Sequence, residues 1–448
     1  MDFLDNLVLP QSAHHMLLLK YLLVLTYILL IPYLSILFGS LILSVYYERK
    51  AAKTSDKKYY WFAKELIDQI TFNKSAAFAL GVVPMMSAAF CYAQLLHLTN
   101  LIVPEFILIA VLIFLIALVL IYTYKYTFHL KDIFSLVSGQ SKNQDELHDE
   151  VESYAIKTSR LHKHSGNYGL TLLVIAVYFF IGAVQLAGDR SAWETRNDFL
   201  GIVISVKSLF YFLQFMIASL AITAALILYK YFRPNSEAKG KDADYLGYVK
   251  NFSLKLGIIS TIIIPLFVVI NIIIKPQDSF SYDVFGYALI ALIGLLIIAI
   301  LYYVMIKESN VRFSSIVIYL FVIVFAFIII KDQYAFDTST KKQFVLLAAN
   351  YEEYQKKVKE EFGLVVETIN GADIYNGKCI ACHQFDRRLV GPPYNETLPK
   401  YEGKKDALVK FILNPVKINP EYPAMPNQGL KPKEAEAVAD YLLSTYKK

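Results

Sequence analysis

Long apolar runs dominate this sequence and constrain its fold more than any other feature. Of its 448 residues, 56% are hydrophobic and only 18% are charged, a composition outside the usual range of soluble proteins. A run of about 20 apolar residues can cross a bilayer as a helix, and these runs lack the alternation of barrel strands. They predict an all-α fold, a polytopic transmembrane helical bundle with about eight spans, near residues 16–46, 76–97, 101–124, 167–187, 199–229, 252–274, 284–306 and 313–330.

Positive charge is unevenly divided between the loops that join these runs. Twenty-one Lys and Arg residues follow the first, third, fifth and seventh runs, whereas the opposite loops hold three, Arg190, Arg196 and Lys275. Because Lys and Arg accumulate on the cytoplasmic side, we expect both termini on the opposite side, which is the periplasm if this is a bacterial inner membrane. Asp2 and Asp5 precede the first run, which is too long for a signal peptide, so we expect that run to be retained.

The composition changes after residue 330. Residues 331–340 are polar and 341–362 have the pattern of a charged amphipathic helix, so 331–362 is predicted to be a helical linker on the periplasmic side. Residues 363–448 contain Gly and Pro at intervals and end in a helical stretch, which indicates a compact extramembrane domain. Residues 1–330 form the transmembrane domain in this scheme.

One motif in the tail carries recognisable chemistry. Cys379-Ile380-Ala381-Cys382-His383 has the C-x-x-C-H pattern of covalent c-type haem attachment. The two thiols can add to the two vinyl groups of one haem, and the adjacent histidine can reach the iron. A zinc half-site and a thioredoxin-like redox pair are the alternatives, but no second Cys/His pair and no βαβ pattern accompany the motif.

A methionine lies downstream between two prolines, in the segment Tyr422-Pro423-Ala424-Met425-Pro426. Met425 is the only methionine of the tail, and a thioether on the iron raises the reduction potential of a haem. The alternative is that Met425 only fills the core of the domain.

From about Gly371 onward the tail resembles the small class I cytochromes c. The resemblance rests on Gly371 near the start of a first helix, on the C-x-x-C-H motif, on Gly391-Pro392-Pro393, on Met425, and on a last helix with Tyr441 and Leu442. It implies one haem c attached to Cys379 and Cys382, His383 as the proximal ligand, Met425 as the distal ligand, and Pro392 as a support for His383. In this family haem c is attached outside the cytoplasm, which agrees with the orientation that the charges predict.

Titratable residues inside or beside the apolar runs form a second candidate site, because charge in a bilayer is costly and often functional. These candidates are His15, His97, Glu105, Lys20 and Lys207, which all fall toward the predicted outer side. Lys207 is expected about 12 Å inside its span, with Glu105 as a plausible counter-charge. A haem b or a quinol could bind such a set, or the residues could simply end their helices in the interface. His129, His148, His162 and His164 are interpreted as surface residues.

The membrane part is remotely similar to the large subunit of the cytochrome bd quinol oxidases. The likeness lies in residues 77–83, in a histidine near the start of the first run, and in Glu105. However, the fifth run has no histidine, the Gly-Arg-Gln-Pro-Trp signature is missing, and the loop of residues 275–283 is too short for that family's quinol-binding loop. Oxygen reduction and quinol oxidation are therefore not implied.

Together these patterns predict a membrane-anchored c-type cytochrome that transfers electrons within a respiratory chain complex. Its expected partners are the lipid bilayer, other subunits of the complex and a redox partner at the haem edge, where Lys378, Arg387 and Arg388 could attract an acidic surface. Nucleic acid is not expected. The membrane part could bind a redox cofactor of its own, or it could be a cofactor-free anchor and docking platform, with only the tail redox active.

Overall fold

The computed structural model describes residues 10–71, 73–140, 145–233, 236, 241–362 and 369–446. The chain divides into two compact units, Met1–Tyr354 and Gln355–Lys448. We call them the membrane unit and the C-terminal unit. The boundary between them falls inside the predicted helical linker, a few residues before the expected start of the C-terminal domain.

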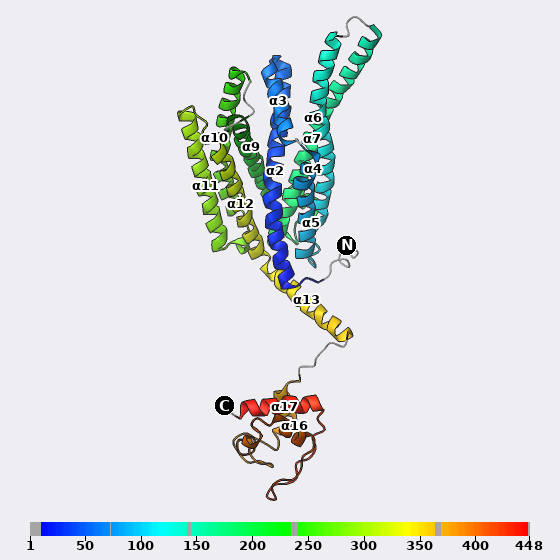
Figure 1. The fold of residues 1–448 in the computed structure, drawn as a ribbon, viewed down its shortest axis with the longest axis vertical. Helices are drawn as coiled ribbons and strands as arrows, with labels where there is room; N and C mark the ends of the chain where they lie inside the picture. Colours follow the sequence, from blue (N-terminus) through cyan, green and yellow to red (C-terminus); the bar gives the residue numbers. More distant parts are fainter. Residues whose placement is uncertain are drawn as a thin grey trace. The chain divides into compact units, whose positions relative to one another are not determined.

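Eight helical segments of the described chain are long and apolar enough to cross a membrane, which confirms the predicted number. They are α2 (Ala13–Thr54), the segment Lys74–Leu95, α6 (Val103–Gln140), α7 (Asp145–Gly188), α9 (Val206–Phe232), α10 (Ala243–Ile273), α11 (Tyr282–Lys307) and α12 (Ser314–Ser339) (Figure 1). The segment Lys74–Leu95 is built from α4 (Lys74–Ala77), the π-helical turn η1 (Phe78–Val82) and α5 (Val83–Leu95). The chain is thus a membrane protein of the predicted all-α class.

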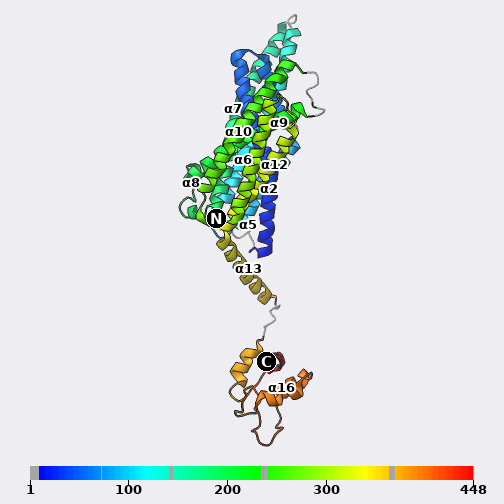
Figure 2. The same cartoon turned by 90° about the vertical axis from the view of Figure 1, so that its left-hand side faces the viewer.

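Helix α2 is the central element of the membrane unit. It packs against α5, α7, α9 and α12, and against the shorter helix α3 (Lys57–Ile70). Figure 2 shows the long helices of this unit running side by side along its length. Leu289, Leu296 and Ile300 of α11 are 51–60% exposed; such large apolar side chains on the outer face of a bundle suit contact with lipid.

The fifth span is shorter than the sequence predicts. Residues 199–203 form a separate helix, α8 (Phe199–Val203), and α9 begins only at Val206. The hydroxyl of Ser205 caps α9 by accepting a hydrogen bond from the backbone N–H of Ser208 at 3.2 Å. The expected depth of Lys207 is therefore wrong, because Lys207 is the second residue of α9 and not a residue well inside a continuous helix.

Residues 331–339 are not a linker but the last turns of α12. Lys331 is fully buried, and Gln333, Ala335 and Phe336 are also buried. The predicted linker is wrong here because polar residues in a sequence indicate exposure to water, whereas these are largely buried within a continuous helix. In the structure an ion pair between Lys331 and Asp332, with 3.0 Å between nitrogen and oxygen, lets the charged residues remain inside the helical bundle. The helix expected to follow is present as α13 (Lys341–Glu361).

Short helices build the C-terminal unit. They are α14 (Gly371–Ile374), the π-helical turn η4 (Tyr375–Cys379), α15 (Tyr394–Thr397), the 3-10 turn η5 (Pro399–Tyr401), α16 (Lys405–Leu413) and α17 (Pro432–Thr445). Their core includes Val438 and Leu442 of α17, Leu408 and Ile412 of α16, and Tyr375. A Cβ atom on Gly371 would lie 2.0 Å from the carbonyl oxygen of Ala437, so the first and last helices approach as closely as only glycine permits.

Candidate functional site

The C-x-x-C-H motif lies at the end of the first helical stretch of the C-terminal unit. The side chain of Asn370 caps this stretch by accepting a hydrogen bond from the N–H of Ala372 at 3.0 Å. After η4 the chain turns tightly, because Cys382 and His383 both donate their backbone N–H to the carbonyl of Cys379, at 3.1 and 2.9 Å. This turn brings two cysteines with free thiols and one histidine to the same cavity.

The imidazole of His383 is held on several sides. Its Nδ1 lies 3.0 Å from the carbonyl oxygen of Pro392, and because a carbonyl can only accept, Nδ1 carries the proton. The ring of Tyr394 stacks on it, with 5.0 Å between ring centroids and 14° between planes. Gly391 packs against the ring so closely that a Cβ there would lie 2.2 Å from Cε1. In the neutral imidazole this tautomer leaves the lone pair of the other nitrogen, Nε2, available to bind a metal.

A cavity of about 500 Å³ opens beside these residues, and its lining includes Cys379, Cys382, His383 and Met425. The volume lies within the range of pockets that hold cofactors and other small molecules. The segment that carries Met425 is fixed on both sides, because Asn427 donates to the carbonyl of Leu413 at 2.9 Å and the Arg388 guanidinium lies 4.4 Å from the centre of the Tyr422 ring. The structure thus brings the four predicted ligand residues around one space.

These residues fit a haem c in their chemistry as well as in their position. Two thiols can form the thioether bonds, an oriented imidazole can bind the iron, and a thioether faces the same cavity. Burial, followed by the neighbouring Cys382, raises the pKa of the Cys379 thiol, and burial raises the pKa of the Tyr394 phenol. Both groups are therefore neutral at pH 7.

The three basic residues predicted at the rim of this cavity each contact other residues of the C-terminal unit. Lys378 donates to the carbonyl of Gln428 at 3.3 Å, and Arg388 lies over Tyr422. Arg387 hydrogen-bonds the side chain of Gln384. All three side chains are exposed.

The five titratable candidates of the membrane unit each have their own surroundings. His15 Nε2 lies 2.8 Å from the amide oxygen of Gln94, and the backbone carbonyl of the buried His97 accepts a hydrogen bond from Gln343 at 2.7 Å. Among the described residues, Oε2 of Glu105 is buried without a hydrogen-bond partner.

The two lysines of that set pair with aspartates that the sequence analysis did not single out. Lys20 lies 3.3 Å from Asp337, and Lys207 lies 2.5 Å from Asp189. The expectation that Glu105 is their counter-charge is therefore wrong. Within the described ranges no group of three or more His, Cys, Asp or Glu side chains could hold a metal ion.

Sequence reasoning also missed two buried polar groups of the membrane unit. His162 was interpreted as a surface residue but is fully buried, stacked on Tyr124 with 4.5 Å between ring centroids, and its Nε2 lies 2.8 Å from Glu48. His129 and His164 are exposed, as expected, and the side chain of His148 lies outside the described residues.

The second missed group is a trio of charges, in which Asp332 lies 3.1 Å from Lys275 and 3.0 Å from Lys331. Apolar residues resume at Ala335 and Phe336 with helical spacing, and this signal could have identified residues 331–333 as part of the last membrane helix.

Comparison with known proteins identifies only the C-terminal unit. The family model described as cytochrome c matches residues 369–446. Cytochrome c-551 of Pseudomonas denitrificans is 30% identical over 79 residues, which are 95% of that protein and 16% of this chain. Cytochromes c-552 of Nitrosomonas europaea and Hydrogenobacter thermophilus are 32% and 35% identical over 71 residues, which are 68% and 70% of those proteins and 15% of this chain. No solved structure matches the chain significantly.

Proposed function

Through residues 369–446 the chain belongs to the cytochrome c family, and on this premise we propose that it is a membrane-anchored electron carrier with one covalently bound haem c. The observation that carries this proposal is the cavity that Cys379, Cys382, His383 and Met425 line together. A haem held there would supply the one-electron couple between ferric and ferrous iron.

Each residue of the site has a distinct role in this proposal. Cys379 and Cys382 would form the thioether bonds, and His383 would bind the iron through Nε2. Pro392 orients His383 by accepting the hydrogen bond from Nδ1–H. Met425 would supply the second ligand to the iron, and a soft sulfur ligand favours the ferrous state and so raises the reduction potential.

The membrane unit ties this carrier to the bilayer. In the proposed orientation both termini lie on the periplasmic side of a bacterial inner membrane, which is supported by the excess of Lys and Arg in the opposite loops. Tethering makes the encounter with a membrane-bound redox partner effectively intramolecular, with an effective concentration on the order of mM where the tether can span the gap. We therefore infer that the chain works as an electron-transfer subunit of a respiratory complex.

The membrane unit could have one of two roles, which differ in whether it binds a redox cofactor of its own. In the first it carries a haem b or acts on quinol, the role considered for the titratable residues His15, His97, Glu105, Lys20 and Lys207. In the second it is a cofactor-free anchor and docking platform. A pyridine haemochrome spectrum of the purified full chain decides between a second haem and none, because haem b and haem c give separate bands. Co-purification in mild detergent would identify the partner subunits.

The haem site is tested by producing the full chain together with the haem-attachment machinery. Intact-mass measurement should show one added haem, and the ferric form should show the weak sulfur-to-iron absorption in the far red. Met425→Leu should abolish that band and lower the potential, because leucine keeps the volume but has no sulfur. Leu389→Ala, at an exposed position outside the cavity lining, is the control and should keep the band. An unmodified mass, or a band that survives Met425→Leu, would contradict the assignment.

A further inference from the structure

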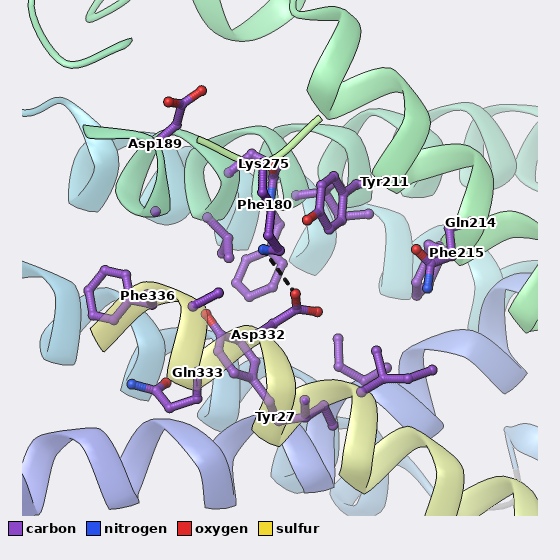
Figure 3. A pocket seen from close by; sticks show the side chains of 18 of the residues that line it. Tyr27, Phe180, Asp189, Tyr211, Gln214, Phe215, Lys275, Asp332, Gln333 and Phe336 are labelled. Carbon is purple, nitrogen blue, oxygen red and sulfur yellow. Dashed lines mark ion pairs between the residues drawn. The ribbon is translucent and has the colours of Figure 1, made fainter. Parts of the chain in front are cut away.

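A second cavity, of about 190 Å³, lies inside the membrane unit. Helices α2, α5, α7, α9 and α12 and the loop before α11 contribute to its lining. Figure 3 shows side chains from these elements converging on one space. None of the predicted membrane candidates His15, His97, Glu105, Lys20 and Lys207 lines it, so this is a different place from the site expected from the sequence.

Six aromatic residues contribute to the walls of this cavity. They are Tyr27, Tyr92, Phe180, Tyr211, Phe215 and Phe336. The hydroxyl of Tyr27 donates to that of Tyr92 at 2.9 Å, which fixes two of these rings. Rings arranged in this way favour a flat, apolar ligand that can stack against them or meet their edges.

One part of the lining is charged. The ammonium of Lys275 lies 3.1 Å from the carboxylate of Asp332, and Figure 3 shows this pair projecting into the cavity near Tyr211. The Asp332 side chain is 36% exposed although it belongs to a helix inside the bundle, so its free surface faces the cavity. A ligand at this point meets a hydrogen-bond donor and an acceptor side by side.

Positive charge is in excess around Asp332. The fully buried Lys331 also lies 3.0 Å from this carboxylate, and its ammonium has no hydrogen-bond partner of good geometry among the described residues. The other carboxylate in the lining, Asp189, is already paired with Lys207. Two lysines thus share one aspartate, and the surplus charge favours a ligand oxygen that carries negative or partial negative charge.

The cavity belongs to the end of the bundle opposite the lysine-rich loops. Asp189 follows the C-terminus of α7, Lys275 follows that of α10, and Tyr211 is about 8 Å beyond the N-terminus of α9. Asp332 is about 10 Å before the end of α12. These positions all lie near the same ends of the membrane-spanning helices.

The lining and volume exclude a haem at this place. Among the described residues that line the cavity there is no histidine, cysteine or methionine, and its volume is less than half that of the cavity in the C-terminal unit. A single ring fits better than a porphyrin. A phospholipid head group is larger and more polar than these mostly apolar walls can satisfy.

We propose that this cavity binds the ring of a membrane quinone or quinol, whose apolar tail remains in the lipid. A quinone carbonyl can accept a hydrogen bond from Lys275, and a quinol hydroxyl can donate one to Asp332, so the pair suits both redox forms. This site rests on the proposed electron-transfer function and deepens it. A quinone is a redox partner that could reach a membrane-bound cytochrome through the bilayer.

Gly188 offers a test that leaves the charged residues in place. It lines the cavity at the end of α7, and a Cβ atom there would meet no atom within 4 Å. Gly188→Phe should therefore fill the cavity without forcing its neighbours apart. Gly286 in α11 has the same free space but does not line the cavity, so Gly286→Phe is the matched control. Asp332→Asn is less suitable, since it also breaks a buried ion pair.

Binding is measured on the full chain in quinone-free phosphatidylcholine nanodiscs. The probe is oxidised ubiquinone-1, and the signal is quenching of Trp193, whose indole N–H donates to the carbonyl of Leu186 beside the cavity at 3.0 Å. Trp61 is the only other tryptophan and is removed by Trp61→Phe in every sample. We expect saturable quenching, at least roughly tenfold weaker affinity in Gly188→Phe, and affinity within about twofold of the parent in Gly286→Phe.

The outcomes separate this proposal from that of the haem site. The quinone site is overturned if Gly188→Phe and Gly286→Phe bind ubiquinone-1 with equal affinity, or if both lose affinity equally. It is also overturned if a co-purified phospholipid occupies the cavity and ubiquinone-1 does not displace it. Peptide mapping after photolabelling with an azidoquinone should give adducts on α9 or α12, and adducts confined to other helices also overturn it. Binding of oxidised ubiquinone-1 needs no electron transfer, so it can be measured whether or not haem c is present. Reduction of haem c by dithionite is recorded separately in each sample and tests the haem site alone.

Discussion

Replacing Gly391 by alanine tests how the C-terminal unit holds its histidine. The added Cβ would lie 2.2 Å from Cε1 and 2.6 Å from Nδ1 of His383, so the ring or the backbone must retreat by about 1 Å to restore ordinary packing. The backbone is fixed, because the N–H of Gly391 donates to the carbonyl of Cys382 at 2.9 Å. The imidazole must therefore give way, and its hydrogen bond to Pro392 is strained or lost.

The cost follows from two contributions. Overpacking of a core position costs about 1–3 kcal/mol, and loss of one neutral hydrogen bond costs about 1 kcal/mol. Gly391→Ala should thus lower the free energy of unfolding of the C-terminal unit by about 2–4 kcal/mol. In a domain of this size each kcal/mol lowers Tm by about 4–8 °C, so a decrease of at least about 8 °C is expected.

The assay is thermal unfolding of the full chain, followed by the haem absorption and by the far-red sulfur-to-iron band. Gly377→Ala is the matched control. A Cβ at this position would meet nothing within 4 Å, and Gly377 lies in η4, the turn that ends at Cys379. The control should unfold within about 2 °C of the parent. The reasoning is refuted if Gly391→Ala unfolds at the same temperature as Gly377→Ala and keeps the band unchanged.

Four further substitutions probe other parts of the molecule. Asp332→Asn should destabilise the membrane unit by about 3–5 kcal/mol because it leaves the buried Lys331 and the largely buried Lys275 without their counter-charge, whereas Lys331→Met should cost less. Thermal unfolding in nanodiscs compares the two variants, and equal midpoints would contradict the argument. Burial opposes ionisation of Glu65, but hydrogen bonds from Lys241 and two tyrosines outweigh it and lower its pKa. Glu65→Gln should therefore cost about 1–3 kcal/mol at pH 7, and the difference in Tm from the parent should shrink as the pH falls below about 4.3; a difference that grows in acid would show the opposite sign. Gly371→Ala should lower the Tm of the C-terminal unit by several degrees, since its Cβ would clash with the backbone of α17, and an unchanged Tm would show that the helices can separate freely.

The features that the sequence predicted correctly are local in the chain. An apolar run long enough for a bilayer is a property of consecutive residues, so the eight spans could be found without any contact between them. The C-x-x-C-H motif is equally local, because two thiols and an imidazole within five residues can act on one haem whatever surrounds them.

Distant pairings were decided by the tertiary structure. Lys207 could have met any acidic group near the same surface, and only the end of α7 beside the start of α9 selects Asp189. Residues 331–333 have a polarity that suits a loop, yet Lys331 and Gln333 are buried, and Lys275, far away in the chain, supplies a partner for Asp332 between them.

The contrast within the haem site has the same physical reason. That Cys379, Cys382 and His383 could hold a haem followed from their sequence, but the return of Met425 to the same cavity requires the fold of the 40 or so intervening residues. The close fit of Gly391 against the imidazole could not be read from a Gly-Pro-Pro segment alone. Spacing along the chain specifies which chemical groups act together locally, whereas burial and charge pairing depend on which surfaces the packed helices bring into contact.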